Sequence, residues 1–241
     1  MAIDAVIFDW GGTLTPWHLI DPGEPWQAYA SVVEPADPDP VAAALLMAEQ
    51  AAWAGMLNGH MSARFADVLD AAEVPYDDRA VEAYRAAWEP HTFTDPDVPV
   101  VFEWLREQGI RVGVLSNTIW PRDWHEFFFT RDGVLDLVDG DVYTSEIPYT
   151  KPHEQAFRSA MAAVGVDDPS RCVFVGDRPY DDISGSSALG MRAIFVPHSD
   201  IPTEQRVPVD VRPDAVVQRL AEVIDHVGSW VDAGQADWAI S

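Results

Sequence analysis

The sequence is poor in basic residues. Its 241 residues carry 15 lysine and arginine side chains against 40 aspartate and glutamate side chains, a formal net charge of -25. This balance excludes the basic stripe that binds nucleic-acid phosphates and disfavours contact with an anionic membrane. It leaves room for a small anionic ligand, because one metal ion or one cation can reverse the potential inside a cleft. We therefore expect a small-molecule partner, with no nucleic acid and no membrane.

Cysteine and long apolar runs are also scarce. The single cysteine, Cys172, cannot form an internal disulfide, and its position in an apolar run predicts a core side chain. No run reaches the roughly 20 apolar residues that a membrane-spanning helix needs. The first residues contain neither the basic region nor the apolar segment of a signal peptide. A cytoplasmic protein is the expectation.

Apolar periodicity predicts an α/β protein. Residues 5–8 form an apolar run that ends at Asp9, as expected for a buried strand that leads into the Gly11-Gly12 turn. Further strands are predicted at 110–115, 142–143, 172–175 and 193–196, and helices at 97–108, 121–129, 152–164, 182–189 and 213–227. Strands separated by helices imply right-handed parallel crossovers, so we predict a three-layer, Rossmann-like parallel sheet.

The segment 16–93 interrupts this alternation. Its first part, 16–40, is rich in proline, tryptophan and acidic residues without a clear period, which predicts a long loop. Helices are predicted at 41–57, at 62–72 with Ser62 as the cap, and at 77–88. We therefore predict a helical insertion of residues 16–93 in a core made of residues 1–15 and 94–241.

Polar groups follow the predicted strands near the points where they end. The four segments are Asp9-Trp10-Gly11-Gly12-Thr13-Leu14, Leu115-Ser116-Asn117, Lys151-Pro152 and Val175-Gly176-Asp177-Arg178-Pro179-Tyr180-Asp181-Asp182. Ligands of open parallel sheets bind at the carboxyl ends of the strands. A carboxylate there, such as Asp9, can act as a covalent nucleophile if the charge of its target is screened. Taken alone, Asp177 is equally explained as a turn residue and Asp181-Asp182 as a helix start.

In this order, the four segments resemble the motifs of the haloacid dehalogenase superfamily of hydrolases, over about residues 3–15 and 97–200. The resemblance implies that Asp9 is the nucleophile, assisted by Ser116 and Lys151. It also implies a Mg²⁺ ion held by Asp9, the carbonyl of Gly11, Asp177 and Asp182, and phosphoryl oxygens held by Gly12, Ser116, Asn117 and Lys151. The insertion lies between the first two motifs, which matches the small helical cap that closes over the site in part of this superfamily.

Lys151 is the only lysine in the chain. Its compact charge, directly before a proline that opens a predicted helix, could neutralise Asp9 and a phosphoryl group. The alternative is a solvated lysine near a helix start, where the helix dipole disfavours a cation.

The chain departs from the phosphatase pattern at Gly11. Phosphatases of this superfamily carry a second aspartate there, which protonates the leaving group, and loss of such an acid costs roughly 10²–10⁴ in rate. Phosphonoacetaldehyde hydrolases also lack it but need a cap lysine, which residues 16–93 do not contain. Dehalogenases lack it too and need no metal, so Asp177 and Asp182 favour a Mg²⁺-dependent phosphatase acting on a small organic phosphate. A 2-haloacid dehalogenase-type hydrolase and a weakly active protein that binds a phosphorylated ligand stay open as alternatives.

Several side chains in the insertion are candidates for substrate contact or for the missing proton. They are Trp17, His18, Trp26, Tyr29, Asn58 and His60, with Trp120 facing them from the core. Each is more often a packing or surface residue than a functional one.

Overall fold

The centre of the protein is a parallel six-stranded sheet. The computed structural model describes residues 3–16, 21–197 and 206–238. The strands are β1 (Ala5–Phe8), β2 (Arg111–Ser116), β3 (Gly140–Tyr143), β4 (Cys172–Gly176), β5 (Arg192–Phe195) and β6 (Ala215–Val216). Their order is β3-β2-β1-β4-β5-β6, with every pairing parallel. The connections therefore turn in opposite directions on the two sides of β1, which makes the β1/β4 boundary a topological switch point.

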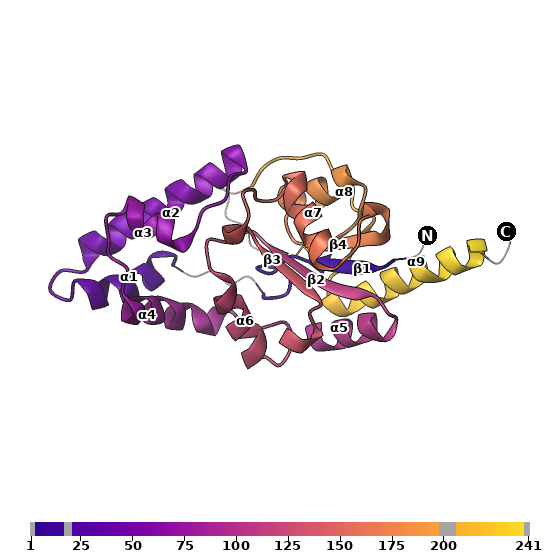
Figure 1. Ribbon diagram of the computed structural model, residues 1–241, viewed down its shortest axis with the longest axis horizontal. Coiled ribbons are helices and arrows are strands. Elements are labelled where there is room, and N and C mark those ends of the chain that lie inside the picture. Colours follow the sequence, from indigo (N-terminus) through magenta and orange to yellow (C-terminus); the bar gives the residue numbers. More distant parts are fainter. Residues whose placement is uncertain (1–2, 17–20, 198–205, 239–241) are drawn as a thin grey trace.

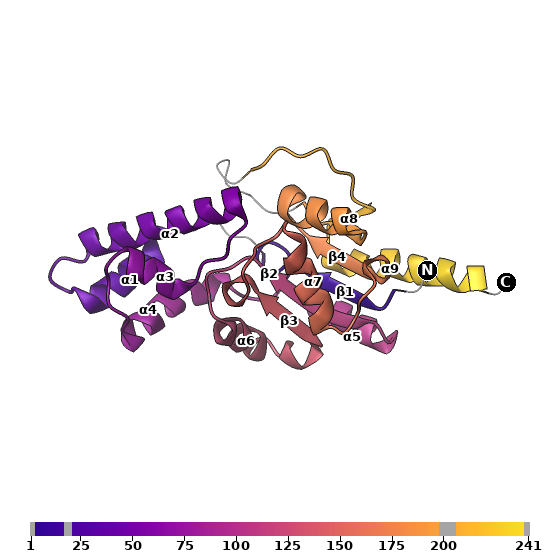
Figure 2. The same ribbon diagram turned by 45° about the horizontal axis from the view of Figure 1, so that its top comes forward.

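Helices cover both faces of the sheet (Figures 1 and 2). On one face lie α5 (Val98–Glu107), α6 (Arg122–Arg131) and α9 (Val223–Trp238), and on the other lie α7 (Glu154–Ala163) and α8 (Gly185–Leu189). Within β1, Val6 and Phe8 pack toward the α5 face, while Ala5 and Ile7 pack toward α7. A strand with both faces covered must be apolar at every position, as 5–8 is. The predicted three-layer α/β fold is confirmed.

The buried surroundings of Cys172 also agree with its predicted place in the core. Its side chain is buried beneath the face covered by α7, and burial raises the pKa of the thiol to about 12. A thiol of that kind is a packing group and a poor nucleophile.

Four helices between β1 and α5 form a separate group at one end of the molecule (Figure 1). They are α1 (Gly23–Val33), α2 (Asp39–Gly59), α3 (Phe65–Ala71) and α4 (Asp78–Trp88). We call these residues, 23–88, the helical block. The predicted start of α4 is confirmed, since the Asp77 side chain accepts hydrogen bonds from the amides of Arg79 and Ala80.

The predicted loop over 16–40 is wrong, because α1 occupies its middle. The helix buries Trp26, Tyr29 and Ala30, a spacing that forms one apolar stripe against the rest of the block. Pro25 lies in the first turn, where a missing amide hydrogen costs no helical hydrogen bond. The proline and acidic residues of this segment led to the prediction of a loop where the structure has a short amphipathic helix.

Two further predictions need correction. The predicted helix 213–227 instead begins with β6, whose residue Ala215 pairs with Ile194, and α9 starts only at Val223. The β6 pairing adds a strand to the sheet, which no local propensity encodes. The predicted cap Ser62 is replaced by a capping interaction two residues later, where the Asp67 carboxylate accepts a hydrogen bond from the Arg64 amide at 2.8 Å.

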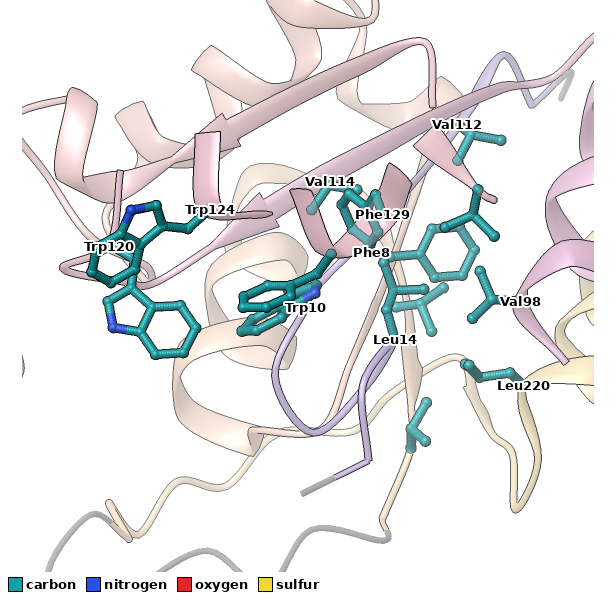
Figure 3. Close-up of a cluster of buried hydrophobic side chains, with 14 of the residues drawn as sticks. Phe8, Trp10, Leu14, Val98, Val112, Val114, Trp120, Trp124, Phe129 and Leu220 are labelled. Carbon is teal, nitrogen blue, oxygen red and sulfur yellow. The ribbon is translucent and has the colours of Figure 1, made fainter. Parts of the chain in front are cut away.

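One continuous aromatic cluster joins the helical block to the sheet. Trp26 and Phe65 stack at 5.3 Å between ring centroids, and Phe65 meets Trp124 of α6 at 5.1 Å. Trp120 contacts Trp124 at 5.7 Å and Trp10 at 5.7 Å. Figure 3 shows Trp10 between this tryptophan pair and the Phe8 side of the core. The block and the sheet therefore share one hydrophobic core.

Among the described residues, α2 is the one helix long and apolar enough to cross a membrane by length and composition. Such a lone helix is weak evidence for a span. It packs against α1 and α3, and its buried Glu49 accepts a 2.8 Å hydrogen bond from the indole nitrogen of Trp26. The buried carboxyl group of Glu49 therefore contributes to packing within the helical block.

Burial raises the pKa of Glu49, while hydrogen bonds from Trp26 and Trp53 lower it, so that the net direction is upward. The folded protein therefore keeps this proton to a higher pH than the unfolded chain, and stability falls as pH rises through the folded-state pKa. We expect Glu49→Gln, which keeps an acceptor for Trp26, to remove that loss. Relative to the wild type, its free energy of unfolding should rise as the pH increases from about 4, the ordinary pKa of a glutamate, through the raised folded-state pKa of Glu49. Urea unfolding across this range measures the gap.

The matched control is Glu107→Gln on the exposed side of α5, which should follow the wild type at every pH. An unfolding free energy of Glu49→Gln that runs parallel to the wild type over the whole range would contradict this account of Glu49.

Candidate active site

The predicted site residues meet at the carboxyl edge of the sheet. Asp9 follows β1 and Asp177 follows β4, the two neighbouring strands at the switch point, and Ser116 ends β2 on the other side of β1. Asp9 is held in line by its amide, which donates to the carbonyl of Val175 at 2.9 Å. Chain segments far apart in sequence thus deliver polar side chains to one place.

Lys151 lies at the centre of this place. Its Nζ is 2.5 Å from Oδ1 of Asp9 and 2.7 Å from Oδ1 of Asp182. All three side chains are at least nine-tenths buried, and Asp177 is 1% exposed. The alternative of a solvated surface lysine is therefore wrong, because the ammonium group is enclosed by carboxylates.

Burial sets the ionisation of this cluster. Burial alone would lower the pKa of Lys151, but the carboxylates of Asp182 and Asp9 raise it above its ordinary value. Burial raises the pKa of Asp182, and Lys151 opposes that rise only in part. Lys151 is therefore held in its cationic form, and its charge in turn limits the upward shift of the pKa of Asp182.

Asn117 positions Lys151 through the backbone. Its side-chain oxygen accepts the Lys151 amide at 2.8 Å, and its side-chain nitrogen donates to the Lys151 carbonyl at 3.1 Å. Both ends of the amide are therefore used to fix the lysine. Contact of Asn117 with a phosphoryl group stays a prediction, as does that of Ser116, which is buried at the end of β2.

The position of Asp182 depends on Gly176, to which the sequence alone assigned no role of its own. A Cβ atom on Gly176 would lie 2.4 Å from the carboxylate carbon of Asp182, so only glycine leaves this space. The Arg178 amide donates to Oδ2 of Asp182 at 2.9 Å, which leaves Oδ1 for Lys151. The only sequence signal was a glycine directly before Asp177 at a strand end.

The turn after Asp9 contains two glycines with different roles. Gly12 has a φ of 91°, in the region that favours glycine, and its amide donates to the Thr15 carbonyl at 2.7 Å. Gly11 is outside that region, and a Cβ atom there would meet nothing within 4 Å. The phosphate contact of Gly12 and the metal contact of the Gly11 carbonyl stay predictions.

The acidic groups fit a divalent cation. Among the described residues, Asp9, Asp177 and Asp182 each offer a carboxylate oxygen, and these oxygens lie within 4.8 Å of one another. Mg²⁺ prefers such hard oxygen ligands and takes one or two carboxylates together with waters and substrate oxygens.

The side chains predicted as candidates for substrate contact or proton supply have separate outcomes. Trp26 and Tyr29 are fully buried packing residues, and Asn58 is exposed and bonded to its own helix. Trp120 is buried, and its indole nitrogen donates to Tyr84 at 3.3 Å. Trp17 and His18 lie outside the described residues. His60 lies beside Tyr180 of the fourth motif, with its Nε2 3.5 Å from the tyrosine oxygen.

Asp181 is a further acid near the site whose place the sequence left unresolved. Burial raises its pKa, with Arg178, Lys151 and His60 lowering it and Asp9 raising it. The charges of His60 and Asp9 both act on Asp181, so the helical block brings His60 into the same neighbourhood as Asp9.

Comparison with known proteins agrees with this geometry. The haloacid dehalogenase-like hydrolase family matches residues 3–190. The chain belongs to this family. In fold, this hydrolase is similar to a haloacid dehalogenase superfamily phosphatase of Thermococcus onnurineus, with a TM-score of 0.68 and 20% identity over 94% of this chain and 98% of the other. It is also similar to L-2-haloacid dehalogenase of Xanthobacter autotrophicus, with a TM-score of 0.63 and 18% identity over 94% and 98%.

The curated relatives match a shorter stretch. Glyceraldehyde 3-phosphate phosphatase of Methanothermobacter thermautotrophicus is 33% identical over 106 residues, which are 44% of this chain and 45% of the relative. Hexitol phosphatase B of Escherichia coli K12 is 33% identical over 133 residues, which are 54% and 57%. This hydrolase thus spans about half the length of these relatives, which are both phosphatases by name.

We expect Mg²⁺ to raise the Tm of this hydrolase, because an ion that binds only the folded state stabilises it. At a Mg²⁺ concentration of about 100 times its Kd, the free energy of unfolding should increase by ~2.7 kcal/mol. Asp177→Asn should reduce the Tm rise, since it removes one of the three carboxylates. Differential scanning calorimetry at matched ionic strength separates ion binding from screening of the net charge.

Asp167→Asn, the same change at an exposed position before β4, should keep the full rise. An Asp177→Asn protein with an unreduced Mg²⁺ effect would show that the ion binds elsewhere.

Proposed function

We propose that this hydrolase is a Mg²⁺-dependent phosphatase that acts on a small organic phosphate, with Asp9 as the nucleophile. The observation that carries the proposal is the contact of Lys151 Nζ with both Asp9 and Asp182 in a buried cluster that also contains Asp177. A dehalogenation site that works without a metal does not require three buried carboxylates this close together. The phosphatase names of the curated relatives support the same reaction class.

The reaction takes two displacements at phosphorus. A carboxylate oxygen of Asp9 attacks phosphorus, the bond to the leaving oxygen breaks with its electron pair, and an acyl phosphate forms. Water then attacks the same phosphorus, the bond to the Asp9 oxygen breaks, and phosphate leaves. Lys151 stabilises the negative charge on the equatorial oxygens in both steps, and it is already held in place before substrate arrives. Ser116 and the Gly12 turn are the proposed partners of the remaining oxygens.

Asp9, the Gly11 carbonyl, Asp177 and Asp182 are the proposed holders of Mg²⁺. When bound, the ion screens the charge of the phosphoryl group, which lets an anionic carboxylate approach it. Without a cation, the three carboxylates, whose oxygens lie within 4.8 Å of one another, would disfavour simultaneous ionisation.

The helical block, within residues 16–93, is the proposed cap of this site. A cap excludes water and selects substrates by their size and polarity. The net charge of -25 disfavours nucleic acid and anionic membranes as partners, so the proposed substrate is a free cytoplasmic metabolite.

The deciding experiment is turnover by wild type and Asp9→Asn on phosphate esters, acyl phosphates and 2-haloacids, with and without Mg²⁺. We expect phosphate release by the wild type that vanishes with a chelator and returns with Mg²⁺. Asp9→Asn keeps the shape of the side chain but loses its nucleophilic charge, so its rate should fall by at least about 10⁴. Asp167→Asn serves as the unchanged control.

Activity of Asp9→Asn within a few-fold of the wild type would exclude the covalent mechanism. Metal-independent halide release would instead establish a dehalogenase. A folded protein that binds Mg²⁺ but turns over none of these compounds would be a phospho-ligand-binding member of the family.

A further inference from the structure

The leaving group of the proposed reaction needs a proton, and the usual place for the acid is vacant. Position 11 is a glycine with open space around it, since a Cβ atom would meet nothing within 4 Å. An alkoxide is a poor leaving group without a proton, whereas an acyl phosphate or activated aryl phosphate leaves unaided. Hydrolysis of an alkyl phosphate therefore requires a donor from another part of the chain.

His60 is the histidine that the helical block brings to this edge of the sheet. It follows α2 with a φ of 53°, a left-handed conformation that ends the helix and redirects the chain. Its carbonyl accepts the amide of Thr150 at 2.9 Å, one residue before Lys151. The next residues extend the contact, with Met61 bridged to Tyr149 and the Ser62 amide donating to the Pro148 carbonyl at 3.1 Å. His60 is thus fixed to the segment that carries Lys151.

The ring of His60 is turned toward the fourth motif. Its Nε2 lies 3.5 Å from the Tyr180 oxygen, and its charge acts on the neighbouring Asp181, as do the charges of Lys151 and Asp9. Its Nδ1 is buried and has no hydrogen-bond partner among the described residues. A buried ring nitrogen without a partner beside the site is available for a ligand atom. Tyr180 and Thr150 together hold the ring and the backbone of His60 on two sides.

We propose that His60 is the general acid and base that replaces the missing aspartate of the phosphatase proposed above. As the bond between phosphorus and the leaving oxygen breaks, the imidazolium of His60 gives its proton to that oxygen, and an alcohol departs. The neutral ring then takes a proton from the water that attacks the acyl phosphate on Asp9, which restores the imidazolium and releases phosphate. An imidazole suits both steps because the same ring can give up a proton and take one back.

The test compares His60→Asn with the wild type on two probes, glycerol phosphate and acetyl phosphate. Asparagine tolerates the left-handed conformation at this position and keeps a polar side chain, but it cannot transfer a proton. We expect kcat/KM for glycerol phosphate to fall by about 10²–10⁴ while that for acetyl phosphate changes less than about threefold. His226→Asn on α9, where the ring of His226 lies beside Trp230, is the matched control and should leave both probes unchanged.

A second variant distinguishes lost acid chemistry from lost shape. Adding Gly11→Asp to His60→Asn places a carboxyl group in the open space after Asp9. If His60 is the acid, this double variant should regain a large part of the lost glycerol phosphate rate. A side chain that only shapes the site cannot be rescued by a carboxyl group at position 11.

The remaining outcomes overturn the proposal in distinct ways. Equal losses on both probes would make His60 a structural residue, and no loss on either would remove it from the mechanism. A wild-type protein that hydrolyses neither probe with Mg²⁺ present would overturn the phosphatase function itself, whereas loss of selectivity between probes concerns His60 alone.

Discussion

The contact between the Lys151 ammonium group and the carboxylates of Asp9 and Asp182 is the interaction on which the rest of the site depends. Charges buried to this degree persist only when they are paired, since an unpaired one costs several kcal/mol. The sheet order makes the pairing possible, because β1 and β4 end side by side and place Asp9 next to Asp177. The three carboxylate oxygens of Asp9, Asp177 and Asp182, which lie within 4.8 Å of one another, are the physical basis for a divalent cation at this edge.

The same cluster connects the two parts of the chain. Lys151 is fixed from the sheet side by the Asn117 amide, and its preceding residue is held by the His60 carbonyl from the helical block. A second, apolar connection runs through Trp120, Trp124 and Phe65. Polar contacts next to the site and aromatic contacts beside it therefore join the block to the sheet domain. Burial of the Asp9, Lys151 and Asp182 side chains strengthens the electrostatic interactions among them.

The sequence predicted the layers of the fold and the acidic strand ends because both depend on local patterns. Apolar runs of strand length identify the central strands, and a carboxylate directly after such a run has few explanations. The sequence did not predict features that depend on contacts between residues far apart in the chain. The β6 strand exists only because β5 offers an open edge, and α1 only because its stripe meets α4. The space that Gly176 leaves for Asp182 and the meeting of His60 with Tyr180 likewise depend on tertiary contacts across the fold.

The central claim is that Asp9 attacks phosphorus. Mass spectrometry of peptides from an acid-quenched, single-turnover reaction with acetyl phosphate and Mg²⁺ tests it most directly, because acid preserves an acyl phosphate long enough to locate it. The account predicts one phosphoryl group on the peptide that contains Asp9, and none when Asp9 is asparagine. Phosphoryl transfer to any other side chain, or phosphate release with Asp9 never modified during turnover, would contradict it.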